Sequence, residues 1–223
     1  MEQLNSIYYL LFGVAVITAI TLLYFASKKN NYVLGIITSI GILQSLISST
    51  DFYADASSIP PRFVFLVLPS FLLLILSLSI PKFRSMCMRF EMKFLILIHV
   101  VRLLVELVLH ALYEIKFIPK VMTYEGNNFD ILIGITAIVI YYLYTNGKLS
   151  SKALLIWNYI GLIFLVNIVL TAIISAPGPQ QFIAFDQPNK AVQHFPFSLL
   201  PAIIVPIVFF SHILSIIKLR SSK

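Results

Sequence analysis

The stretch FLILIHVVRLLVELVLHALYEI, residues 94–115, decides how this sequence is interpreted. It is mostly leucine, isoleucine and valine, and it is as long as the roughly 20 apolar residues that a helix needs to cross a bilayer. Its ionisable side chains follow one another at intervals of three or four residues: His99, Arg102, Glu106, His110 and Glu114. At 100° per residue they share one helix face, which is expected to point into a helix bundle because charged groups are costly against lipid.

Apolar segments of this kind make up most of the chain. They cover residues 6–27, 32–50, 63–80, 94–115, 129–146, 153–175 and 197–217. Backbone polar groups must be paired within lipid, so each segment is expected to be a helix. The sequence predicts an all-α, polytopic membrane protein in which residues 1–223 form a single bundle of seven transmembrane helices.

The composition agrees with a lipid-embedded chain. Charged residues make up 11% of the sequence and hydrophobic residues 59%, whereas a soluble domain carries about 25% charged residues. The net charge of +7 does not indicate nucleic-acid binding, because the cations lie in short clusters between apolar segments, as expected near anionic lipid headgroups. The single cysteine, Cys87, excludes an intramolecular disulfide and a cysteine-based metal site.

The cations also predict an orientation. One set of connections carries eleven of them and the other set four. The larger set is Lys28, Lys29, Lys82, Arg84, Arg89, Lys93, Lys148, Lys152, Lys218, Arg220 and Lys223; the smaller is Arg62, Lys116, Lys120 and Lys190. The positive-inside rule places the larger set in the cytoplasm and, with seven spans, the N-terminus outside. The first segment is expected to be a span and not a cleaved signal peptide, because no Lys or Arg precedes it.

Part of the sequence recurs along the chain. The matching positions are Tyr24 with Tyr144, Lys28 with Lys148, Leu34 with Leu154, Gly41 with Gly161, Phe63 with Phe195 and Pro69 with Pro201. One interpretation of these matches is a parallel repeat of three helices, a joining helix and three more, an arrangement that recurs in transporters. The alternative is a chance alignment of apolar helices.

The polar face of residues 94–115 has two interpretations. Arg102 and Glu106 are four residues apart and can pair along the helix, which would make the face an internal salt bridge that fixes this helix at the centre. Alternatively, Glu106 and His110 pass a proton or hold an ion, since a buried ion pair adds little stability over apolar packing.

Two histidines are predicted to share one depth in the membrane. His99 lies six residues after Lys93, His212 six before Lys218, and Asn158 six after Lys152. At 1.5 Å per residue, all three belong about 9 Å inside the same boundary. His99 and His212 are therefore candidate ligands of haem or another metal ion, and the alternative is two separate core histidines held by hydrogen bonds.

The opposite side carries a second polar group. Glu125 and Asn128 precede the segment 129–146 and Asp130 lies at its start, where they either bind a ligand or cap the helix. The long loop before the last segment contains Asp186 and His194, and such loops are often functional. We expect this loop to cover a pocket in the outer half of the bundle, beside His110 and Glu114, with Asn167 reaching it from below. Pro201 and Pro206 are expected to interrupt the last helix.

Three stretches resemble an uncharacterised bacterial family of multi-pass membrane proteins. They are RLLVELVLHALYEIKFIPKVMTYEGNNFDILIGITA from Arg102, SAPGPQQF from Ser175 and FPFSLLPAIIVPIVFFSHIL from Phe195. The resemblance extends over the third to seventh segments. It implies a location in the bacterial cell membrane, the inner membrane, and implies no activity.

These features favour a transporter or ion-coupled permease for a small solute over an enzyme. The alternatives are an intramembrane enzyme or haem- or metal-binding membrane protein, and a non-catalytic accessory subunit. No phosphate-binding loop, HExxH or GxSxG motif is present in the sequence. The sequence leaves the substrate, the direction of transport and the oligomeric state open.

Overall fold

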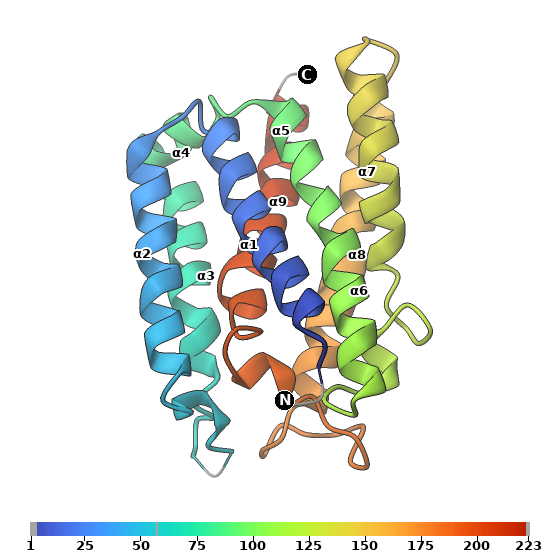
Figure 1. Cartoon of the computed structure of the whole chain (residues 1–223). Helices are drawn as coiled ribbons and strands as arrows, with labels where there is room; N and C mark the ends of the chain where they lie inside the picture. Colours follow the sequence, from blue (N-terminus) through green and yellow to red (C-terminus); the bar gives the residue numbers. More distant parts are fainter. Residues whose placement is uncertain (1–3, 57, 222–223) are drawn as a thin grey trace.

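The chain folds into a bundle of helices whose axes run roughly up and down (Figure 1). The computed structural model describes residues 4–56 and 58–221, and all regular secondary structure in these ranges is helical. Lys223, one of the predicted cytoplasmic cations, lies outside the described residues.

The helices match the predicted segments to within a few residues at most ends. They are α1 (Ser6–Ala26), α2 (Asn31–Ser48), α3 (Val64–Ser79), α4 (Pro81–Cys87), α5 (Met92–Leu97), α6 (Val101–Glu114), α7 (Asp130–Thr145), α8 (Ser151–Ser175) and α9 (Val205–Ser221). A 3₁₀ turn, Ile98–Val100, joins α5 to α6, so that the segment predicted over residues 94–115 is one helical unit. A π-helical turn, Leu200–Ile204, leads into α9.

Five helical units are long and apolar enough to cross a membrane: α1, α2, Met92–Glu114, α8 and Leu200–Ser221. Helices α3 and α4 add a sixth if they count as one span, although the chain bends by 95° between them. Helix α7 is apolar but has only 16 residues. The described residues thus have the helices that a membrane protein requires.

The starts of several helices follow from single polar residues in the connections. A side-chain oxygen just before the helix accepts a hydrogen bond from a backbone N–H of its first turn, which would otherwise lack a partner. The pairs are Asn5 with Ile7 (3.0 Å), Asn30 with Tyr32 (2.9 Å) and Ser150 with Ala153 (3.1 Å). At α4 the first residue is Pro81, whose fixed φ suits that position.

The predicted basic connections all lie at one end of the bundle. Figure 1 shows the α1–α2 and α7–α8 turns, α4 and the start of α5 at the end where the described part of the chain finishes. The chain begins at the opposite end, together with the three longer connections, residues 49–63, 115–129 and 176–199. The segregation of charge that the sequence predicts is therefore preserved in three dimensions.

Two helical units form the centre. The spanning windows within Met92–Glu114 and Leu200–Ser221 are 67% and 61% buried, whereas that of α2 is only 11% buried. Three alanines of α1, at positions 15, 19 and 26, are fully buried and allow close packing in the interior. The prediction that the polar face of residues 94–115 points into the bundle is confirmed for His99, Arg102 and Glu106 and is wrong for Glu114, which is exposed.

The last helix is interrupted where its prolines predict. Pro201 lies in the π-helical turn, and Pro206 is the second residue of α9. A proline lacks the N–H for the regular ladder, so the wider turn accommodates the two rings without ending the helical path.

Candidate functional site

The polar face of α5 and α6 is buried at one end and exposed at the other. His99, Arg102 and Glu106 are at most 3% exposed, His110 is half-buried, and Glu114 is exposed. The three buried residues meet polar side chains from α7, α8, α9 and the loop before α7. We call this group the Arg102 cluster; its members are His99, Arg102, Glu106, Asn128, Asp130, Asn158 and His212.

Arg102 connects four helices. Its Nη1 lies 3.3 Å from Oδ1 of Asp130 at the start of α7, and its Nη2 lies 3.5 Å from the carbonyl oxygen of Gly161 in α8 and 3.2 Å from Nε2 of His212 in α9. The predicted pairing along the helix with Glu106 is wrong: the carboxylate that Arg102 contacts is Asp130. The planar guanidinium has five donors in a fixed fork, which lets one side chain reach all these partners.

The contact with Arg102 fixes the tautomer of His212. A guanidinium only donates, so Nε2 of His212 accepts, and the neutral ring carries its proton on Nδ1. Nδ1 then donates to Oδ1 of Asn158 at 2.9 Å, and Nδ2 of Asn158 donates to the carbonyl oxygen of Leu154 at 2.9 Å. The hydrogen bonds therefore run in one direction from Arg102 into α8.

His99 and His212 lie together, as their shared depth predicts. Their ring centroids are 3.9 Å apart and their planes 22° from parallel, and Trp157 packs edge-on against His99 at 5.2 Å. Both His212 nitrogens are engaged in hydrogen bonds, so His212 has no free nitrogen for haem iron or another metal ion. Among the described residues, no group of three or more His, Cys, Asp or Glu side chains could hold a metal ion.

Glu106 lies at the outer end of the cluster. Its Oε1 accepts a hydrogen bond from Nδ2 of Asn128, which also donates to the carbonyl oxygen of Met122 at 3.1 Å. Oδ1 of Asn128 accepts from the backbone N–H of Asp130 at 3.1 Å, so Asn128 satisfies the first N–H of α7 from one residue before the N-cap position, Phe129. The capping role and the polar site thus depend on the same residue.

The other candidate residues of the outer side lie apart from this cluster. Glu125 pairs with His110 at 4.0 Å and with Lys120 at 3.6 Å near the surface. His194 pairs with Asp51 at 3.1 Å. Nδ2 of Asn167 donates to the carbonyl oxygen of Asn127 at 2.9 Å, whereas the Asp186 side chain is exposed.

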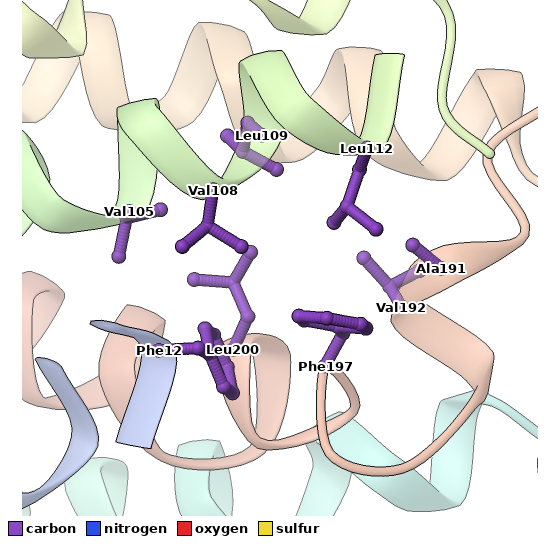
Figure 2. Close-up of a pocket in the computed structure, with 9 residues that line it drawn as sticks. All are labelled: Phe12, Val105, Val108, Leu109, Leu112, Ala191, Val192, Phe197 and Leu200. Atoms are coloured by element: carbon purple, nitrogen blue, oxygen red, sulfur yellow. The ribbon is translucent and has the colours of Figure 1, made fainter. Parts of the chain in front are cut away.

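The long loop before the last helix folds back over the outer end of α6. Nε2 of Gln187 donates to the carbonyl oxygens of Tyr113 and Ile118, at 3.0 and 2.6 Å. Beneath the loop, beside Leu109 and Leu112 of α6, lies an apolar void of about 10 Å³ (Figure 2). A void of this size holds about one water molecule at most. The polar side chains of the cluster do not line it.

Two residues of the site escape sequence reasoning. Trp157 covers His99 and donates from Nε1 to Oγ1 of Thr136 at 3.0 Å. Gly161 lets α8 approach His212 so closely that a β-carbon there would lie 2.4 Å from its Cε1. A glycine three residues after Asn158 in an otherwise apolar helix was the available signal, because glycine within a helix often marks a close approach.

A family model described as a domain of unknown function, DUF8737, matches residues 59–220. The match includes every residue of the Arg102 cluster. No curated protein and no solved structure matches the chain. The match extends over more than half of the sequence and agrees with the resemblance to an uncharacterised family. The chain therefore belongs to the family with the domain of unknown function DUF8737.

Proposed function

We propose that this chain is an ion-coupled permease for a small solute in which the Arg102 cluster binds and releases a proton. The protein crosses the bacterial inner membrane seven times, with the N-terminus outside and the C-terminus in the cytoplasm. The gathering of the basic connections at one end of the bundle supports this orientation.

The charge balance of the cluster carries the proposal. The Arg102 guanidinium interacts electrostatically with two carboxyl groups, Asp130 in direct contact and Glu106 beyond it. All three side chains are at least nine-tenths buried. One positive charge cannot neutralise two carboxylates, and an unpaired buried charge is costly. A proton on one carboxyl group restores neutrality, so the cluster is built to hold one exchangeable proton.

Glu106 is the carboxyl group that takes this proton. Asp130 is in contact with Arg102 and accordingly keeps its charge. Glu106 has Asn128 on Oε1 and the backbone of Tyr124 beside its carboxyl group, and its Oε2 makes no hydrogen bond of regular geometry among the described residues. A carboxyl group with one free oxygen can carry a proton there without losing an existing bond.

The cluster extends over about two turns of the central helical unit, from His99 to Glu106. Asn128 and Glu106 lie towards the outer connections, and the stacked rings of His99 and His212 lie towards the opposite end, beside Asn158. Both nitrogens of His99 lack a partner in the described part of the chain. Beyond Arg102, the unpartnered nitrogens of His99 are thus a further place within the same cluster where a proton that leaves Glu106 can be accepted.

Proton movement in proteoliposomes tests the proposal. Purified protein is reconstituted with a pH-sensitive dye inside, and a membrane potential or a gradient of Na⁺ or K⁺ is imposed. We expect proton flux above that of protein-free vesicles, and its loss in Glu106→Gln. The matched control is Glu114→Gln, an exposed glutamate two turns away on the same helix, which keeps the flux.

Two results would overturn the proposal. Vesicles with wild-type protein that conduct protons no faster than empty vesicles would exclude proton coupling. Full flux in Glu106→Gln would show that the cluster has a structural role only.

A further inference from the structure

A second feature of the bundle is a large cavity on the side away from the Arg102 cluster. Its volume is about 590 Å³, within the range of about 300–1,000 Å³ that ligand sites occupy. It lies between α2, α3, α4 and the start of α9, and its walls include Val33, Ile36, Leu73, Met86, Ile203 and Ile207. The bend between α3 and α4 places α4 across one end of it.

The walls offer almost no hydrogen bonds to a ligand. Three residues with hydroxyl groups line the cavity. Tyr32 is 85% exposed, and backbone carbonyl oxygens of the protein already satisfy the hydroxyl groups of Ser70 and Ser77. Oγ of Ser70 donates to the carbonyl oxygen of Ala202 at 2.5 Å, and Oγ of Ser77 to that of Leu74 at 2.7 Å. A polar solute would lose its hydration there without replacement, so the interior selects a hydrocarbon.

One edge of the cavity is cationic. Lys82 of α4 lines it and is exposed, and its ammonium group forms no ion pair within the described residues. Lys28 and Lys29 occupy the α1–α2 turn at the same end of the bundle. A ligand seated in this cavity thus meets apolar walls along its length and positive charge at one end.

We propose that this cavity binds an acyl chain of an anionic membrane lipid, with the lipid headgroup at Lys82. The apolar volume fits a chain, and the lysine supplies the complementary charge. Two of its walls, α2 and the helical unit Leu200–Ser221, are long and apolar enough to span a membrane, so lipid is the hydrocarbon they meet. The site is separate from Glu106 and does not rest on proton coupling.

Native mass spectrometry of the detergent-purified protein tests this assignment. The probes are phosphatidylglycerol and phosphatidylcholine with identical palmitoyl and oleoyl chains. We expect one phosphatidylglycerol to be retained about fivefold more tightly than phosphatidylcholine, because a lysine lies beside its anionic headgroup. Lys82→Gln should remove this preference, whereas Arg84→Gln, an exposed cation on the same helix that does not line the cavity, should keep it.

Filling the cavity gives an independent test. Val33→Trp and Ile36→Trp place an indole in the cavity and should abolish the tightly bound lipid, whereas Ile42→Trp on the exposed face of α2 should not. If Val33→Trp fails to fold, Ile36→Trp, at a half-exposed position, provides the test. Equal retention of the two lipids by wild type, or a tight lipid in a folded cavity-filled variant, would mean nonspecific surface lipid and overturn the assignment.

Discussion

Arg102 and Asp130 form a buried ion pair that joins α6 to the first residue of α7, with 3.3 Å between Nη1 and Oδ1. The pair holds α7, an apolar helix of only 16 residues, against the most buried of the helical units long enough to span a membrane. The same guanidinium contacts α8 and α9, so removal of this one side chain affects three helix contacts.

Arg102→Leu should lower the free energy of unfolding by about 3–5 kcal/mol, because Asp130 is left as an uncompensated buried charge. The measurement is thermal or denaturant unfolding in detergent. Asp130→Leu in addition to Arg102→Leu should recover part of the loss. An Arg102→Leu variant as stable as the wild type would contradict the role of this pair.

Gly161→Ala should destabilise the protein by about 1–3 kcal/mol, the cost of overpacking. The new methyl carbon would lie 2.4 Å from Cε1 of His212, whose ring is held by Arg102 and Asn158 and cannot easily move. The matched control is Gly35→Ala in α2, where no atom lies within 4 Å of the added carbon. That change should stabilise by about 0.5–1 kcal/mol, and equal effects at both positions would refute the close approach.

Tyr53→Phe should cost about 1–3 kcal/mol, because it leaves the buried Oε1 of Gln44 without its donor. Burial also raises the pKa of Tyr53 above its ordinary value of about 10. The unfolded chain therefore loses this proton first, and the stabilisation is complete below about pH 10 and is lost as the pH rises further.

Unfolding measured across the alkaline range checks this pH dependence. The loss of stability at high pH should be smaller in Tyr53→Phe than in the wild type. The control is Tyr32→Phe, at a tyrosine that is 85% exposed, which should leave the profile unchanged. Identical alkaline profiles for Tyr53→Phe and the wild type would exclude the effect.

Glu106→Gln should remove a carbonyl stretching band of a protonated carboxyl group from the infrared spectrum of the protein in lipid. The reason is the excess of one buried carboxyl group over Arg102. Glu114→Gln, at an exposed position, should keep the band. A wild-type spectrum without such a band at neutral pH would show that both carboxyl groups of the cluster are ionised.

The sequence predicted the helical segments because hydropathy is a property of contiguous residues. The unit Met92–Glu114 was found with its polar face pointing inward, and the common depth of His99 and His212 followed from distance along each helix. The number of membrane crossings, their orientation and the internal repeat stay predictions.

The sequence by itself determined which side chains are too polar to face lipid. Their partners were decided only by the tertiary structure. Arg102 pairs with Asp130 and not with Glu106, because the packing of α6 against α7 brings a carboxylate closer than the next turn of its own helix does. The lipid-sized cavity beside α4 likewise had no sequence signal, since its volume depends on how four separate segments pack and where α3 bends. Local patterns fix which groups must be buried, and packing between distant segments fixes what those groups meet.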